Sequence, residues 1–269
     1  MTTDQLATAA RSLRDAAASG QYLPPLRETY PTLDAKSAYE IQRINTEHRV
    51  ASGRRIVGRK IGLTARAVQT QLGVNQPDFG VLFDDMGYGD GEPVPLLALQ
   101  QPKIEAEVAF VLGRDLDMPS PSQVDVMRAI DHALPALEIV GSRIANWSIK
   151  FVDTVADNAS SSAYVLGSTP RRLSDFDLRL CGMVMTRRGE PVSVGAGAAC
   201  LGNPINAVVW LARTMAALGE PLRAGDLVLS GALGPMVPVL PGDVFETRIH
   251  GLGGIKAVFE AASNTKEQA

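Results

Sequence analysis

The chain has 269 residues, of which 45% are hydrophobic and 20% charged, with a formal net charge of −3 and a sequence pI of about 5.7. This composition is ordinary for a folded protein with a full core, and it excludes the strongly basic surface that nucleic acids and anionic membranes select. The sequence has no apolar run of the ~18 residues that a membrane-spanning helix needs and no secretory signal, so we expect a cytoplasmic protein.

Cysteine and histidine usage excludes the common disulfide and zinc motifs. Cys181 and Cys200 lack CxxC spacing, and we expect both thiols to be reduced. His48, His132 and His250 lie far apart in the sequence and form no HExxH motif. Any metal ion would therefore need oxygen ligands, which favours magnesium or manganese.

The first part of the chain is predicted to be helical. Apolar residues recur at helical spacing over residues 3–18, which Thr3 can cap, and over residues 34–52, where Asp34 is a suitable N-cap. We treat residues 1–53 as an N-terminal helical segment. Its apolar stripes would suit an interface between subunits.

From Arg54 the sequence changes to short strands, glycines and tight loops. A strand predicted over 56–61 carries Lys60, which is unusual in an apolar strand, although a lysine that blunts a strand edge would give the same pattern. Asp78 lies in the predicted loop 75–80, where an aspartate is most often a turn former. These local patterns leave both residues open to a purely structural role.

The strand predicted over 103–112 carries two acids that need a chemical explanation. Because strand side chains alternate, Glu105 and Glu107 point to the same face, with Cα atoms ~6.6 Å apart, so both carboxylates can reach one ion. Two neighbouring anions at a partly apolar wall repel and lose hydration unless a cation is present. A solvated strand face that happens to carry two acids is the alternative that this segment leaves open.

A third carboxylate lies in the apolar run 134–140. A buried, unpaired Glu138 would cost several kcal/mol, so this residue must either meet a cation or be protonated. One ion bound by Glu105, Glu107 and Glu138 would account for all three acids at once.

Further helices are predicted from capping residues and apolar spacing over 64–72, 122–133 and 204–218. In the second of these, Val124, Met127 and Ile130 are expected to face the core. The third opens with an Asn-Pro pair and has the clearest apolar stripe, so it is the helix expected to pack against a sheet.

Two loops could contribute to a site. The polar segment 151–163 is expected to wrap a site, and the glycine-rich loop 230–235 can offer backbone N–H groups to an anion, although a plain chain reversal would look the same. The predicted fold class is α+β, with many short strands in a rolled or sandwiched mixed sheet. We assign residues 54–262 to one catalytic domain and 263–269 to a tail.

Several long motifs point to a family. They lie at residues 58–64, 76–80, 103–116, 135–167 and 202–234, and they fall in order over roughly residues 25 to 260. The sequence resembles the 2-hydroxypenta-2,4-dienoate (2-keto-4-pentenoate) hydratases of aromatic meta-cleavage pathways. The resemblance implies the fumarylacetoacetate hydrolase-like fold, a mixed β-roll or sandwich with an N-terminal helical segment.

The resemblance also implies an activity and a metal site. The expected enzyme is a hydro-lyase that adds water to 2-hydroxypenta-2,4-dienoate and yields 4-hydroxy-2-oxopentanoate. Its cofactor would be Mg²⁺ or Mn²⁺, with Glu105, Glu107 and Glu138 as the metal ligands. Relatives often carry cysteine at the position of Ser161, a departure that leaves the ligands intact but alters the pocket wall.

Other residues are candidates for the proton chemistry and for substrate binding. Lys60 and Asp78 precede the ligand strand, and a lysine near a metal can have its pKa lowered while a carboxylate can position or deprotonate water. Ser160 and the backbone at Ser230 and Gly231 are expected to bind the substrate carboxylate.

Two other reactions and one non-enzymatic role are considered. The sister 2-oxo-3-hexenedioate (4-oxalocrotonate) decarboxylase acts on a dicarboxylate and would need a further cation, for which Arg143 or Lys150 could serve; a hydratase of a longer or dicarboxylic dienoate is also open. A partner subunit without activity would bind no metal. The resemblance further implies a homo-oligomeric ring, a pentamer or decamer, and allows association with the downstream aldolase.

Overall fold

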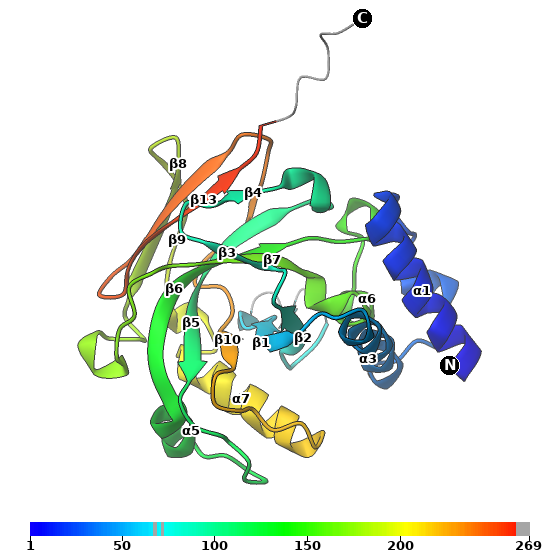
Figure 1. Cartoon of the computed structure of the whole chain (residues 1–269), viewed down its shortest axis with the longest axis horizontal. Helices are drawn as coiled ribbons and strands as arrows, with labels where there is room; N and C mark the ends of the chain where they lie inside the picture. The colour runs from blue at the N-terminus through cyan, green and yellow to red at the C-terminus, as the bar shows by residue number, and fades with distance from the viewer. Residues whose placement is uncertain (67–68, 71–72, 262–269) are drawn as a thin grey trace, which may run out of the picture.

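The computed structural model of the protein describes residues 1–66, 69–70 and 73–261 (Figure 1). The predicted helix 64–72 contains residues outside this description, and the predicted tail 263–269 lies wholly outside it. Within the described part, no helix is long and apolar enough to cross a membrane.

The larger of two β-sheets has eight strands in the order β2-β1-β10-β5-β6-β7-β3, and β11 pairs with β5 outside this path. Its strands are β1 (Ile56–Gly62), β2 (Asp78–Phe83), β3 (Gly87–Gly89), β5 (Lys103–Leu112), β6 (Ile130–Val140), β7 (Ser161–Leu166), β10 (Leu227–Leu229) and β11 (Val237–Pro238). The antiparallel pair of β5 and β6 is the longest in the sheet and runs through the middle of the molecule (Figure 1). The strand predicted over 103–112 is confirmed.

The smaller sheet has five strands in the order β4-β13-β12-β8-β9. They are β4 (Pro93–Val94), β8 (Gly182–Arg187), β9 (Glu190–Ala196), β12 (Val244–Ile249) and β13 (Gly253–Phe259). Val108 and Phe110 of β5 share one hydrophobic cluster with Phe245 of β12 and Ala257 of β13. The two sheets therefore bury a common core, and the predicted α+β class with mixed sheets is confirmed.

The N-terminal helices are α1 (Thr3–Ser19), α2 (Leu26–Thr29) and α3 (Ala35–Ala51), and they lie beside α6 (Phe151–Ala156) at one side of the molecule (Figure 1). Both predicted long helices are confirmed, with Asp34 as the cap of α3 and Thr2, rather than Thr3, as the cap of α1. Their apolar stripes pack against Phe151 and Val155 of α6. The stripes are thus core within this chain, not the exposed surface that a subunit interface would need.

Two helix predictions had different outcomes. The helix α7 (Pro204–Ala217) is confirmed, with Asn203 as its cap. The other helix, α5 (Gln123–Ala129), ends before β6 begins at Ile130, because the last predicted turn pairs with β5 instead. Of the three residues predicted to face inward, Val124 and Met127 are exposed, whereas Ile130 is buried as the first residue of β6.

Gly58 is required where β1 runs parallel to β10. A Cβ atom at this position would lie 1.8 Å from the carbonyl oxygen of Leu227, so an alanine would force the two strands apart. We expect Gly58→Ala to lower the free energy of unfolding by about 2–4 kcal/mol in urea titrations. The control is Gly182→Ala in β8, where a Cβ meets no atom of the described structure within 4 Å. Equal stability of the two variants would contradict this prediction.

Candidate active site

The register of β5 against β6 gathers three carboxylates. Glu105 lies directly opposite Glu138, and Glu107 follows two residues later on the same face of β5. One oxygen of each carboxylate lies within 4.8 Å of one oxygen of the other two. Glu107 and Glu138 are fully buried and Glu105 is 9% exposed, so the alternative of a solvated strand face is wrong.

Few protein groups satisfy these oxygens. The backbone N–H of Gly231 donates to Glu107 Oε2 at 2.8 Å. Within the described residues, Glu107 Oε1 and both oxygens of Glu138 have no hydrogen-bond partner, and Glu138 Oε2 has only the ion pair with Lys60. Buried carboxylate oxygens without donors are costly. A cluster of such oxygens fits a divalent cation that prefers oxygen ligands.

The protonation of the carboxylates reflects their burial. Burial raises the pKa of Glu105 to about 7, and the negative charge of Glu138 acts in the same direction while Lys60 opposes it. Burial likewise raises the pKa of Glu107 well above its ordinary value, with the two neighbouring glutamates adding to the effect. Without a cation, the fold therefore disfavours the ionised form of its own acids.

Lys60 lies beside this cluster on β1. Its Nζ is 3.2 Å from Glu138 Oε2 and donates a hydrogen bond to the carbonyl oxygen of Ala159 at 2.9 Å. Because β1 lies between β2 and β10 and Lys60 is buried, the alternative of an edge-blunting lysine is wrong. Burial lowers the pKa of Lys60, but Glu138 and the other nearby carboxylates raise it more. The protein groups alone therefore raise this pKa, which is opposite to the expected lowering.

Asp78 is the first residue of β2 and lies opposite Gly62 of β1. It is 1% exposed and part of a strand, so the alternative that it is only a turn former in a loop over 75–80 is wrong. Burial raises the pKa of Asp78 to about 6, while Lys60 lowers it. One oxygen, Oδ1, has no hydrogen-bond partner in the described part of the chain. This oxygen can therefore accept a hydrogen bond from a bound molecule.

A cavity of about 320 Å³ adjoins these groups, with Lys60, Asp78 and Glu105 among its lining residues. Ser160 also lines it, and its hydroxyl lies 3.0 Å from that of Thr154. The segment 151–163 does reach the site, but as α6 and a 3₁₀ turn rather than as a loop. The structure therefore groups four of the predicted site residues around one space.

The backbone of the glycine-rich loop 230–235 was expected to bind the substrate carboxylate, but its polar groups contact other parts of the protein. The N–H of Gly231 is already engaged by Glu107, and the hydroxyl of Ser230 donates to the carbonyl oxygen of Gly231 at 3.3 Å. Gly231 has φ = 104°, and a Cβ there would lie 2.4 Å from the Thr64 hydroxyl oxygen. The loop therefore orients the carboxylate of Glu107, and only a glycine fits at position 231.

Several of the residues that line the cavity were not predicted from the sequence. The ammonium of Lys103 lies 4.3 Å from the centre of the Trp147 ring, and both residues line the cavity with Ile149 and Met236. Neither of the two predicted cations is among the lining residues, and Arg143 is instead paired with Asp157. The position of Lys103 at the start of the acidic strand, two residues before Glu105, was the signal that could have identified it.

Comparison with known proteins agrees with this geometry. The family model described as fumarylacetoacetate (FAA) hydrolase C-terminal matches residues 50–260. The solved structure of a 4-oxalocrotonate decarboxylase from Pseudomonas putida G7, complexed with magnesium and adipate, is 37% identical, covers 96% of this chain and 98% of that chain, and has a TM-score of 0.93. Fold and carboxylate cluster together define a member of the fumarylacetoacetate hydrolase family.

Two relatives are more similar in sequence. A 2-keto-4-pentenoate hydratase of Paraburkholderia xenovorans is 63% identical over 97% of this chain and 97% of its own length. The TodF product hydratase of Pseudomonas putida is 59% identical, again over 97% of both chains. The chain belongs to the 2-keto-4-pentenoate hydratases of this family.

The raised pKa of Glu105 predicts how pH affects the metal-free protein. The ordinary pKa is 4.5 and the folded value about 7, so between these values the folded state holds more protons than the unfolded state. The free energy of unfolding should therefore fall by about 3 kcal/mol as pH rises through this window. Urea unfolding in chelator at several pH values measures this slope. Glu105→Gln should make the slope shallower without abolishing it, because the pKa values of Glu107 and Asp78 are also raised, and an identical slope in that variant would refute the assignment.

Proposed function

We propose that the protein is a divalent-metal-dependent hydratase of aromatic meta-cleavage catabolism. It adds water to 2-hydroxypenta-2,4-dienoate and releases 4-hydroxy-2-oxopentanoate. The observation that carries the proposal is the cluster of three buried carboxylates beside Lys60 and Asp78. It occurs in a chain that is 63% identical, over nearly its full length, to a 2-keto-4-pentenoate hydratase.

Glu105, Glu107 and Glu138 would hold Mg²⁺ or Mn²⁺. The support is chemical, because the cluster offers only oxygen ligands and leaves three of their oxygens without a hydrogen-bond partner in the described structure. When bound, the ion supplies Lewis acidity toward the substrate carboxylate and C2 oxygen. The chain's own part is to hold the three carboxylates on two paired strands, so that they do not reorganise during the reaction.

Lys60 and Asp78 are the groups proposed to move protons. The dienol loses its C2 hydroxyl proton and gains one at C5, which gives the conjugated 2-oxo acid; water then adds at C4, and a proton at C3. Lys60 is held as a cation by its carboxylate neighbours, so it would stabilise negative charge on the C2 oxygen. Its proposed proton delivery would require a bound cation to offset those carboxylates, because on their own they raise its pKa. Asp78, with a pKa of about 6 and a free oxygen, accepts the proton of the attacking water.

Ser160 is proposed to donate a hydrogen bond to the substrate carboxylate. Thr154 lies within hydrogen-bond distance of its hydroxyl and so restricts the direction in which that hydroxyl points. Gly231 and Ser230 contribute indirectly, by fixing Glu107 through the backbone of their loop. The apolar side chains of Trp147, Ile149 and Met236 would enclose the vinyl end of the substrate and exclude water.

Decarboxylation of 2-oxo-3-hexenedioate is the alternative that a specific feature keeps open. Lys103 is a cation in the cavity wall and could receive a second carboxylate. The hydratase proposal is favoured because the hydratase relative is 63% identical, whereas the decarboxylase is 37% identical. A hydratase of a longer dienoate would use the same apolar end of the cavity.

Three further proposals rest on the family resemblance. The chain would form a homo-oligomeric ring, pentameric or decameric, would associate with the downstream aldolase, and would act in the cytoplasm. Light scattering after size-exclusion chromatography measures the assembly, and co-elution with the aldolase measures the association.

Loss of one metal carboxylate should abolish most of the activity. We expect Glu105→Gln or Glu107→Gln to lower kcat/KM at least about 100-fold, as chelator should in the wild type, because a weakened site no longer retains the ion. The assay is the decay of dienol ultraviolet absorbance with Mg²⁺ or Mn²⁺, run beside the decarboxylase substrate. Glu246→Gln, an exposed glutamate of β12, is the control. Activity that survives chelator and both substitutions would exclude the metal mechanism, and faster turnover of the dicarboxylate would favour decarboxylation.

Removal of the buried ammonium should affect turnover more than binding. We expect Lys60→Ala to lower kcat by about 10²- to 10⁴-fold, the range for a lost proton-transfer group. Lys36→Ala on the exposed face of α3 is the matched control and should behave as the wild type. Steady-state kinetics with saturating metal separate kcat from KM. Near-normal turnover of Lys60→Ala would remove this lysine from proton transfer.

A further inference from the structure

The segment Asn158–Ser160 has a strained backbone beside the catalytic cavity. Asn158, Ala159 and Ser160 have φ of 55°, 49° and 59°, so three consecutive residues other than glycine lie in the left-handed region. Each such residue costs free energy and persists only where the surrounding structure enforces it. Ala159 and Ser160 line the catalytic cavity, and the carbonyl oxygen of Ala159 accepts the hydrogen bond from Lys60 at 2.9 Å. The strained backbone therefore supplies a contact to a proposed catalytic group.

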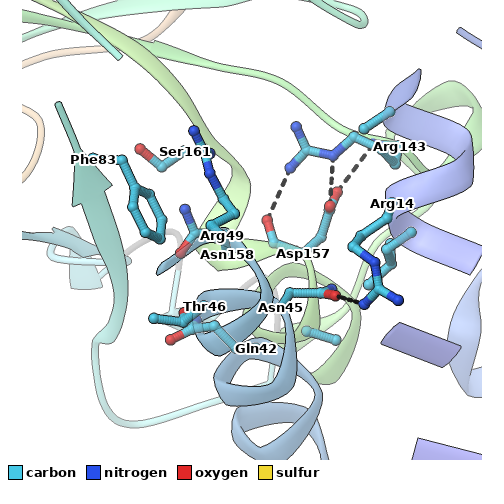
Figure 2. Close-up of a pocket in the computed structure, with 13 residues that line it drawn as sticks. Arg14, Gln42, Asn45, Thr46, Arg49, Phe83, Arg143, Asp157, Asn158 and Ser161 are labelled. Atoms are coloured by element: carbon cyan, nitrogen blue, oxygen red, sulfur yellow. Dashed lines mark hydrogen bonds and ion pairs between the residues drawn. The ribbon is translucent and has the colours of Figure 1, made fainter. Parts of the chain in front are cut away.

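Both ends of this segment are held by other parts of the chain. The backbone N–H and the guanidinium of Arg143 bind the carboxylate of Asp157, the residue before the segment (Figure 2). At the other end, the carbonyl oxygen of Ser160 accepts a hydrogen bond from the N–H of Gly141 at 2.8 Å. These two anchors fix where the segment begins and ends, and its contact with β2 is made by Asn158.

The side chain of Asn158 attaches the segment to the outer edge of β2. Its oxygen accepts a hydrogen bond from the N–H of Val81 at 2.8 Å, and its nitrogen donates one to the carbonyl oxygen of Val81 at 3.0 Å. One amide thus satisfies both backbone groups of Val81 at the end of the sheet, in place of a further strand. The contact is close, because a Cβ atom at Gly80 would lie 2.4 Å from the carbonyl oxygen of Asn158.

These contacts form a closed ring that contains Lys60. Gly80, the residue before Val81, lies opposite Lys60 in the pairing of β2 with β1. Val81 binds the amide of Asn158, and the next residue along the chain, Ala159, binds Lys60 Nζ through its carbonyl oxygen. Displacement of Asn158 from Val81 would therefore move the acceptor of the Lys60 ammonium.

The direction of this ammonium matters because a lysine has three N–H donors. One donates to the carbonyl oxygen of Ala159, and Glu138 Oε2 lies 3.2 Å from the same nitrogen. Two fixed directions about a tetrahedral nitrogen determine the third, which is left for a substrate in the cavity that Lys60 lines. Without the Ala159 acceptor, the ammonium would be free to rotate about its bond to the side chain.

We propose that Asn158 is a positioning residue for the hydration. Its amide holds the carbonyl of Ala159 where that carbonyl directs the Lys60 ammonium toward the C2 oxygen of the substrate. Asn158 itself touches no reacting atom. The inference rests on the proposed function, because the step that Asn158 assists is the one assigned to Lys60. Removal of the amide should therefore slow turnover, and should do so only through Lys60.

A double-mutant cycle with Lys60 tests the proposal. Asn158→Gly removes the amide and keeps the backbone, because glycine adopts the left-handed conformation readily. We expect it to lower kcat at least about tenfold, since a small displacement of a catalytic group is costly. In a Lys60→Ala background the same substitution should change kcat less than about twofold, because no ammonium is left to orient. Steady-state kinetics on the dienol, with saturating Mg²⁺ or Mn²⁺ and raised concentrations of the slow variants, give the four kcat values.

A merely structural role of Asn158 would give a different result. It would lower kcat by the same factor in both backgrounds, and either that outcome or an unchanged kcat of Asn158→Gly would overturn the proposal. Should Asn158→Gly fail to fold, Asn158→Asp decides the question by the same cycle, because it keeps the acceptor for the Val81 N–H and loses the donor.

The control is Asn206→Gly in α7. This exposed asparagine likewise donates to a backbone carbonyl, that of Leu201 at 3.0 Å, and it does not line the catalytic cavity. Its kcat should equal that of the wild type.

The wild type and Lys60→Ala separate this inference from the proposed function. A wild type that does not hydrate the dienol would overturn both. Turnover that depends on Lys60 but not on Asn158 would overturn the inference alone, and so would near-normal turnover of Lys60→Ala.

Discussion

The mutual repulsion of three carboxylates held face to face by β5 and β6 governs the chemistry of this protein. When ionised, the three glutamates and Asp78 carry four negative charges and Lys60 returns one, which leaves a balance of −3 in a buried space. A divalent ion reduces this to −1. Strand pairing on both sides of β5 fixes the register, so the acids cannot move apart without breaking the sheet. The folded state therefore retains the electrostatic repulsion between the buried carboxylates.

Local sequence patterns predicted the elements whose causes are local. The strand Lys103–Leu112 follows from alternation, and the helices α1, α3 and α7 follow from caps and apolar spacing. The segment 151–163 was predicted to be a loop, but it contains the helix α6, which is stabilised by a residue distant in the sequence. Asp153 of this helix is buried and accepts hydrogen bonds from Arg27, which lies 126 residues earlier. No pattern within a window of the sequence contains such a partner.

The residues of the candidate site likewise divide into those that a local sequence pattern identifies and those that depend on contacts distant in the sequence. The three glutamates and Lys60 could be identified because a charge in an apolar strand is anomalous wherever it occurs. Asp78 was named as a candidate for proton transfer, although its local pattern indicated a turn. Only the pairing of β2 with β1 shows that it is buried. Trp147 and Thr154 carried no anomaly of their own, because each is ordinary until the chain folds around the cavity.

The cavity is built from two kinds of structure, and this has an evolutionary consequence. The carboxylates and Lys60 come from strands paired on both sides, while Trp147, Ile149 and Met236 come from segments between strands. Substitutions in those connecting segments can reshape the far end of the cavity without disturbing the strands. A lineage could therefore exchange one substrate for another while its acidic centre stays unchanged, and the shared architecture of a decarboxylase only 37% identical to this chain agrees with such a history.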